Sequence, residues 1–293
     1  MHIDLELVRR LIDAQFPHYR HLPLTPVAQS GWDNRTFRLG EHLSVRLPSA
    51  EAYVAQVHKE ARWLPYLSAR CAITLPTVVT VGEPAEGYPW PWSVRRWIPG
   101  QTLLEAQAHL SSSTDIARGV GEFLRRFAAI ETLDGPLAGA QNHHRGGRLK
   151  VYDAQMQHAL TLFEQTDVGA ARIAHQHWAT ALVSDFGGPG VWVHGDMSAD
   201  NLLIDQDRLS AVIDFGCLGV GDPACDLAIA WTFFDETARV AFKAAVDVDE
   251  QTWSRGRGWA LWKALIVNVG LVDTKAQEKA GAPGTLARIL AEA

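Results

Sequence analysis

Cysteine is scarce in this chain, and no apolar run is long enough for a membrane span. The 293 residues include three cysteines, an odd and sparse set that excludes a disulfide framework and lacks the spacing of a zinc site. The most apolar late stretch, residues 264–272, is too short to cross a bilayer, and residues 1–16 carry acids where a signal peptide would be apolar. We therefore expect a soluble, cytoplasmic protein in a reducing compartment, with no membrane partner.

An excess of positive charge is missing as well. Lys and Arg number 27 against 33 Asp and Glu, which gives a formal net charge of −6. This balance argues against a nucleic-acid partner. It suits a cationic substrate, although many proteins carry such a charge for solubility alone. The length of the chain allows one large domain or two lobes that share a cleft.

Strand patterns dominate the first hundred residues, with one prominent helix among them. Residues 5–16 place apolar groups at the spacing of one helix face, and a longer pattern of this kind follows Ser49. Short β-leaning runs separated by glycine and proline predict antiparallel strands. These runs occupy residues 27–40, 42–49, 74–83 and 92–100.

Helical patterns take over after residues 98–103. They cover residues 113–130, 152–164, 171–185, 236–245 and 252–272. The change in pattern predicts an α+β protein with a strand-rich lobe at residues 1–97 and a mainly helical lobe at residues 98–293. The basic segment NHHRGGR at residues 142–148 is expected to be a solvated connection.

One stretch places carboxylates beside short apolar runs: VHGDMSADNLLIDQDRLSAVIDFG, at residues 193–216. Its two apolar runs flank the polar turn DQDR and predict a β-hairpin. Asn201 stands at the hairpin entry and Asp214 at its exit, so antiparallel pairing would bring their side chains close together. Asp196 lies on the loop just upstream.

The three side chains suit phosphoryl transfer when they are taken together. Mg²⁺ prefers a few carboxylate or amide oxygens along with water and substrate phosphates, and Asn201 and Asp214 would supply such oxygens. Asp196, set apart from this pair, suits acceptance of a proton from an attacking hydroxyl. Singly, each residue is equally well explained as a turn cap or a strand end; their order and spacing favour catalysis.

The order HGD at 194–196, Asn201, and DFG at 214–216 resembles the catalytic signature of protein kinases. With the following GDPACDLAIAW and the earlier GWDNRTFRLG and SVRLP, the chain resembles the aminoglycoside phosphotransferase and choline-kinase-like family. The resemblance implies a bilobal protein-kinase-like fold, with a small antiparallel-sheet N-lobe and a larger, mainly helical C-lobe. It also implies that Asp196 is the catalytic residue and that Asn201 and Asp214 are Mg²⁺ ligands.

The resemblance implies a nucleotide site in the first lobe as well. Its phosphate loop would contain Ser30 and Gly31, with a single glycine where protein kinases have several. Arg46 stands where lysine is commoner; arginine stays charged and donates bidentately to phosphate. We choose Glu60 over Glu51 as the carboxylate that holds Arg46, because Glu60 borders the apolar face of its helix.

The strand with Arg95 and Trp97 resembles the segment that links the lobes and would bind the purine of ATP or GTP through its backbone. Side-chain identity there does not distinguish the two nucleotides. Lys59 and Arg62 are expected to face solvent. In the helical lobe, four tryptophans are expected in the core: Trp231, Trp253, Trp259 and Trp262.

The resulting prediction is a Mg²⁺-dependent kinase that moves the γ-phosphate of ATP or GTP to a hydroxyl of a small molecule. An aminoglycoside or related antibiotic is one candidate acceptor, and an amino alcohol or a sugar is another. Acidic residues of the helical lobe would line a pocket for a polyamine, although solvated helix faces explain them equally well: Asp235, Glu236, Asp247, Asp249, Glu250 and Asp273. A nucleotide-binding pseudokinase or scaffold is the alternative that the glycine-poor loop and Arg46 motivate.

Overall fold

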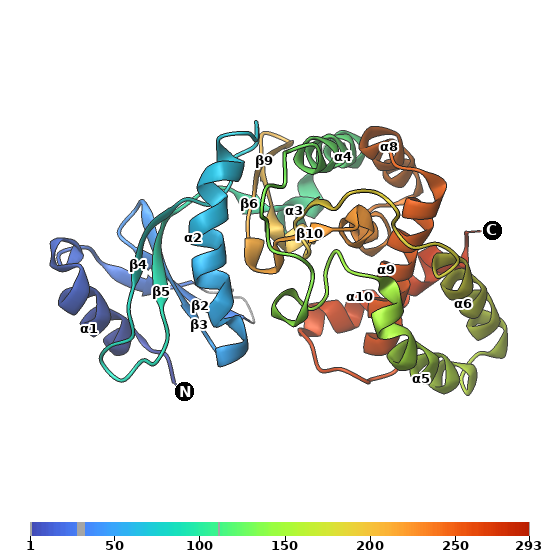
Figure 1. The fold of residues 1–293 in the computed structure, drawn as a ribbon, viewed down its shortest axis with the longest axis horizontal. Helices are drawn as coiled ribbons and strands as arrows, with labels where there is room; N and C mark the ends of the chain where they lie inside the picture. Colours follow the sequence, from blue (N-terminus) through green and yellow to red (C-terminus); the bar gives the residue numbers. More distant parts are fainter. Residues whose placement is uncertain (1, 28–32, 111, 293) are drawn as a thin grey trace. The chain divides into compact units, whose positions relative to one another are not determined.

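The computed structural model describes residues 2–27, 33–110 and 112–292. The chain divides into two compact units (Figure 1). The first contains the residues up to Gly100 and, in addition, Ser210–Cys217; the second contains Gln101–Leu209 and the residues from Leu218 onward. Within the described ranges, none of the helices has the length and apolar character that a membrane crossing requires.

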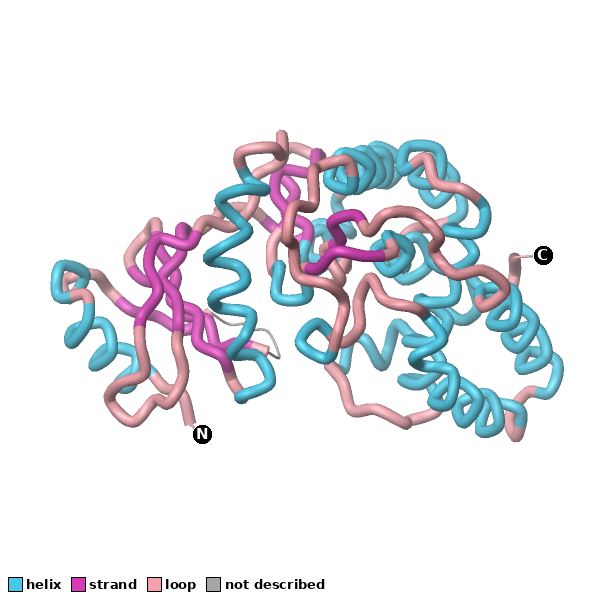
Figure 2. The backbone as a smooth tube through the Cα atoms, viewed as in Figure 1, coloured by secondary structure: helices cyan, strands magenta, loops and turns pink. Residues whose placement is uncertain are grey.

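The first unit is built on a five-stranded antiparallel sheet, as predicted (magenta strands, Figure 2). Its strand order is β1-β2-β3-β5-β4. The strands are β1 (Leu24–Pro26), β2 (Asn34–Leu39), β3 (Leu43–Pro48), β4 (Val78–Gly82) and β5 (Trp92–Arg96). The central strand β3 is paired with β2 on one side and β5 on the other, so a side chain on it is held rigidly in register.

Two helices accompany this sheet. Helix α1 (Leu5–Gln15) begins where the Asp4 side chain accepts a hydrogen bond from the Leu7 N–H, and its apolar face joins the core formed by β2, β3 and β5. Helix α2 (Val54–Ser68) follows a 3-10 turn at Glu51–Tyr53. It buries polar Gln56 and Glu60 beside its apolar residues, and a buried carboxylate requires a partner.

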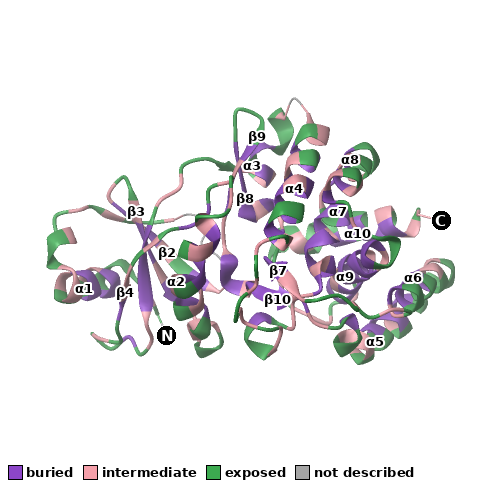
Figure 3. Ribbon diagram, turned by 45° about the horizontal axis from the view of Figure 1, so that its top comes forward, coloured by how far each residue is buried: buried purple, intermediate pink, exposed green. Residues whose placement is uncertain are grey.

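The second unit is mainly helical, also as predicted. Its helices are α3 (Leu103–Ala106), α4 (Ser113–Ala128), α5 (Asp153–Glu164), α6 (Val168–Ala181), α7 (Ile229–Thr232), α8 (Glu236–Val246), α9 (Glu250–Asn268) and α10 (Ala276–Leu290). Helix α9 is buried along most of its length (purple in Figure 3). The four tryptophans expected in the core of this unit are all buried.

Helix α10 was not predicted, because Gly281, Pro283 and Gly284 disfavour a helix in its middle. Tertiary packing outweighs this propensity: α10 buries Ala282, Thr285, Leu286 and Ile289 against its neighbours. Three of the acidic residues suggested for a polyamine pocket have other partners in the structure. Asp235 and Asp249 are the N-caps of α8 and α9, and Glu250 pairs with Lys243 at 2.8 Å.

The predicted hairpin is present as β8 (Leu202–Asp205) and β9 (Arg208–Val212), in a sheet ordered β6-β8-β9 with β6 (Gln101–Thr102). Gln206 and Asp207 form the two-residue turn, and both have left-handed backbone conformations, with φ of 48° and 57°. Two left-handed residues are the hallmark of the tight turn whose twist matches a hairpin. The hairpin ends are therefore fixed in register.

The segment at 142–148 is more than the solvated connection we expected. Asn142 is fully buried, and its side chain bonds the backbone at Gly139 and Arg145. The Gly146 carbonyl accepts a 2.7 Å hydrogen bond from the Asp222 N–H, immediately after β10 (Gly219–Gly221). Strand β10 pairs antiparallel with β7 (Val191–Val193), so this segment supports the ladder that leads into the HGD loop.

This packing predicts a large stability effect at Gly221. A Cβ atom added there would overlap the Gly146 carbonyl oxygen, which is backbone and cannot rotate away. We expect Gly221→Ala to lower the free energy of unfolding by about 3 kcal/mol. The matched control is Gly281→Ala in α10, where an added Cβ meets no atom within 4 Å and should stabilise by about 0.5 kcal/mol. Urea unfolding of both variants checks this; equal midpoints would contradict the packing.

Candidate active site

The HGD loop of the second unit is anchored by a buried carboxylate. Strand β7 ends at Val193, and the backbone N–H groups of His194 and Gly195 each donate a 2.7 Å hydrogen bond to Asp226. Asp226 is 3% exposed. Burial raises the pKa of Asp226, and the hydrogen bonds from the two N–H groups oppose that rise. Asp226 therefore fixes the backbone just before Asp196.

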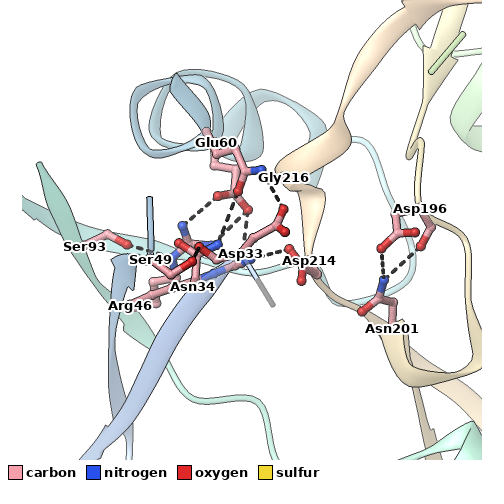
Figure 4. A network of polar contacts seen from close by, with 12 residues as sticks. Asp33, Asn34, Arg46, Ser49, Glu60, Ser93, Asp196, Asn201, Asp214 and Gly216 are labelled. Atoms are coloured by element: carbon pink, nitrogen blue, oxygen red, sulfur yellow. Dashed lines mark hydrogen bonds and ion pairs between the residues drawn. The ribbon is translucent and has the colours of Figure 1, made fainter. Parts of the chain in front are cut away.

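Asp196 itself is exposed, and Asn201 holds it from one side. The Asn201 Nδ2 group donates to the Asp196 carbonyl at 2.8 Å and to its carboxylate at 3.2 Å (Figure 4). The Asp196 N–H is directed at His194 Nδ1, at 3.2 Å, which agrees with a buttressing role for this fully buried histidine. The Asp196 carboxylate is thus oriented and still accessible, as a proton acceptor must be.

In the first unit, Arg46, Glu60 and Asp214 form a connected group (Figure 4). The Arg46 Nη1 atom lies 3.5 Å from Glu60 Oε1, while Arg46 Nη2 donates a short hydrogen bond to Asp214 Oδ1. Burial alone would lower the pKa of Arg46, but the negative charges of Asp214 and Glu60 outweigh it and raise that pKa. Arg46 is permanently charged in this setting.

Glu60 is bound more closely by Arg95 than by Arg46. Arg95 Nη1 and Nη2 donate to the two Glu60 oxygens at 3.0 and 2.7 Å, and Arg95 Nε donates to Ser93 Oγ at 2.9 Å. The Glu60 side chain is 1% exposed and the Arg95 side chain 6%. Burial would raise the pKa of Glu60, but the charges of Arg95 and Arg46 outweigh it and lower that pKa. Glu60 is a buried, ionised carboxylate between two guanidinium groups.

The DFG residues are attached to helix α2. Asp214 has a left-handed backbone with φ of 63°, an unusual conformation for a residue with a side chain. The Lys59 Nζ atom donates to the Gly216 carbonyl at 2.7 Å, and the Gln56 amide packs so closely on Gly216 that a Cβ there would touch it. Our expectation that Lys59 faces solvent is therefore wrong: it is half-buried, and burial lowers its pKa.

Three further residues were predicted to bind the nucleotide: Ser30, Gly31 and Trp97. Ser30 and Gly31 lie outside the residues that the structure describes. Trp97 is described, but its backbone N–H already donates to the His42 carbonyl at 2.8 Å, and Arg38 lies over its ring at 4.1 Å. That N–H is therefore engaged within the first unit. The next residue, Ile98, donates no backbone hydrogen bond to the described residues.

The donor chemistry of Asn201 and Asp214 suits Mg²⁺. The Asn201 Nδ2 group is occupied by Asp196, while its Oδ1 atom accepts no hydrogen bond from the described residues; Asp214 supplies a carboxylate that is 34% exposed. Both are hard oxygen ligands. Among the described side chains, three or more His, Cys, Asp or Glu residues gather nowhere as a metal-binding group. A cation held by either residue would thus need phosphate and water oxygens as well, which is usual for Mg²⁺.

Sequence reasoning missed a charged group around Asp200, four residues after Asp196. The pKa of Asp200 is raised, first by burial and then by the negative charges of its neighbours, while Lys275 opposes the rise. The acidic neighbours are Asp196, Glu105 and Glu278. Glu278 belongs to the unpredicted helix α10, so no local pattern revealed this group.

Comparison with known proteins places the chain in context. The sequence profile described as the phosphotransferase enzyme family matches residues 24–259. An aminoglycoside 3'-phosphotransferase from Escherichia coli is 30% identical over 150 residues. That alignment spans about half of either protein, 50% of this chain and 53% of the E. coli protein.

Solved structures confirm the predicted protein-kinase-like fold. A GDP complex of aminoglycoside 2'-phosphotransferase-IIIa matches with a TM-score of 0.77 at 19% identity, covering 98% of this chain and 97% of the other. The GDP and kanamycin complex of APH(2'')-IIIa matches with a TM-score of 0.76 at 18% identity, covering 98% of both chains. At these identities the likeness shows the fold alone.

Proposed function

Because the chain belongs to the phosphotransferase enzyme family, we propose that it transfers the γ-phosphate of ATP or GTP to a hydroxyl of a small molecule. One observation carries the proposal: the exposed Asp196 carboxylate is held by Asn201 on a loop whose backbone is tied to buried Asp226. In this role Asp196 orients the acceptor hydroxyl and takes its proton. Phosphoryl transfer needs positioning and charge stabilisation more than covalent chemistry.

The other polar and charged groups would bind the metal ion and the nucleotide in this proposal. Asn201 and Asp214 would hold Mg²⁺, which supplies positive charge to the transferred phosphate when it is bound. Arg46 would donate to the nucleotide phosphates, since it is charged and already ordered by Glu60 and Asp214. Because the Trp97 N–H is engaged, we propose the Ile98 N–H as a donor to the purine edge.

A small acceptor suits the chain better than a protein. Only Leu218 separates Cys217 from strand β10, and Pro223 opens the next helical turn. A segment this short leaves little chain on which a peptide substrate would dock. The acidic group around Asp200 favours an acceptor that carries amines, because an ammonium would offset the negative charge of the half-buried Asp200 and its acidic neighbours. An aminoglycoside fits this description, and so does a simple amino alcohol.

The raised pKa of Asp200 predicts how kcat/KM for an amine-bearing acceptor depends on pH. The pKa of Asp200 is raised, so its negative charge is lost on acidification at a higher pH than for an ordinary aspartate. We expect kcat/KM for an amine-bearing acceptor to fall as the pH decreases through this range. Asp200→Asn should raise the KM of that acceptor about tenfold at neutral pH and remove this part of the pH dependence. A hydroxylated acceptor without amines is the control, and its KM should not change; an unchanged KM for the amine would exclude Asp200 from acceptor binding.

The proposal is tested by screening for acceptor-dependent release of nucleoside diphosphate. Mg²⁺ with ATP or GTP would be offered together with aminoglycosides, macrolides, amino alcohols and sugars in separate reactions. We expect turnover with at least one class that carries amines. Nucleotide binding with no turnover across all four classes would favour the pseudokinase alternative.

A further inference from the structure

Two guanidinium groups, one buried and one largely buried, share a single carboxylate in the first unit. Arg95 binds both oxygens of Glu60, at 3.0 and 2.7 Å, and Arg46 approaches one of them at 3.5 Å. The other arm of Arg46 is bound to Asp214. The side chains of Glu60, Arg95 and Arg46 are 1%, 6% and 11% exposed. Water therefore contributes little to their solvation, and the choice of partner determines where each charge points.

Each of the three guanidinium nitrogens of Arg95 donates a hydrogen bond within the protein. Its Nε atom donates to Ser93 Oγ, and its two terminal nitrogens donate to Glu60. Turning the Arg95 side chain toward a nucleotide would therefore break a buried, bidentate ion pair, and such a pair is expensive to break. The direct nucleotide contact that we predicted for Arg95 would have to come from its backbone.

Without Arg95, Glu60 would still need a counter-charge. Arg95 and Arg46 are the two cations whose charges lower the pKa of Glu60, and Arg46 already lies within ion-pair distance. A carboxylate this deeply buried cannot stay ionised unpaired. It would draw the Arg46 fork away from Asp214 and from any phosphate.

We propose that Arg95 is a positioning residue: by saturating the Glu60 carboxylate, it leaves Arg46 to Asp214 and to the nucleotide phosphates. This inference rests on the proposed nucleotide binding. It also accounts for arginine at position 46. The planar fork presents one nitrogen to Glu60 and another to Asp214, whereas a lysine would present a single point charge.

The test compares Arg95→Met with the double variant Arg95→Met, Glu60→Gln. In the single variant Glu60 captures Arg46, so we expect the KM for Mg²⁺-nucleotide to rise about tenfold while the acceptor KM and kcat change about twofold or less. Glutamine at position 60 is neutral and does not hold Arg46 as an ion pair. The double variant should therefore recover a nucleotide KM within about threefold of the original.

Recovery of the nucleotide KM in the double variant distinguishes this proposal from other roles for Arg95. If Arg95 bound the nucleotide directly, or merely supported the fold, neutralising Glu60 would not restore the nucleotide KM, and a double variant no better than Arg95→Met would overturn the inference. Should Arg95→Met fail to fold, the neutral, polar Arg95→Gln with and without Glu60→Gln takes its place, and the same recovery is expected. Calorimetry of the unaltered protein with Mg²⁺-nucleotide tests the proposed function separately: no binding would overturn that function, whereas binding that Arg95→Met leaves unchanged would overturn only the role of Arg95.

Discussion

Replacing Asp196 with asparagine is expected to reduce kcat by about a thousandfold or more while leaving nucleotide affinity within about twofold. Asparagine keeps an oxygen that can accept the hydrogen bond from Asn201 Nδ2, which spans 3.2 Å in the native protein. It cannot take a proton from the acceptor hydroxyl. The loss is thus chemical, because the loop remains tied to Asp226.

The matched control for this variant is Asp205→Asn. Asp205 is an exposed aspartate at the end of β8, and its replacement removes one negative charge without touching the HGD loop. We expect its kcat to equal that of the unaltered enzyme. Steady-state kinetics and nucleotide titration of both variants measure kcat and nucleotide affinity. Full turnover by Asp196→Asn would remove the catalytic role from Asp196.

The second large effect is expected at Asp226. Its two oxygens accept the N–H groups of His194 and Gly195, both at 2.7 Å, and an asparagine would present an NH₂ group to one of those donors. We expect Asp226→Asn to lower the free energy of unfolding by about 3 kcal/mol and kcat by about a hundredfold, since the backbone before Asp196 is released. Thermal unfolding and kinetics at a temperature where the variant is folded measure the two effects.

Asp235→Asn provides the comparison for Asp226. Asp235 also accepts a backbone N–H, from Ala238 at 2.8 Å, but as the N-cap of α8. Asparagine is an equally good N-cap, so this change should cost less than about 0.5 kcal/mol and leave kcat unchanged. If Asp226→Asn behaved in the same way, the anchoring of the HGD loop would not depend on two acceptor oxygens at position 226.

The local sequence pattern was sufficient to predict the secondary structure of the catalytic segment. The hairpin at 202–212 follows from two apolar runs around a polar turn, and its register follows from the tight turn itself. Glu60 was selected because it borders the apolar face of α2, and the structure places it beside Arg46. These features depend on residues close together in sequence, whose geometry a helix or hairpin fixes.

Contacts between segments that are distant in sequence could not be predicted from local sequence patterns. Helix periodicity does not say which element packs on a given face, so the contact of Lys59 with Gly216, 157 residues away, was not predicted. The bidentate pairing of Arg95 with Glu60 likewise joins a strand and a helix 35 residues apart. The proposed roles of Ser30 and Gly31 stay predictions, because those residues lie outside the described ranges.

Phosphorus NMR of the reaction tests phosphoryl transfer most directly. The enzyme would be incubated with Mg²⁺, ATP or GTP, and the acceptor selected by the screen, with and without a chelator of divalent ions. We predict a new phosphoester resonance that grows as the γ-phosphate signal declines and that is absent with the chelator or with Asp196→Asn. Loss of the γ-phosphate into inorganic phosphate alone, or formation of the phosphoester by Asp196→Asn at the native rate, would contradict transfer to a hydroxyl held by Asp196.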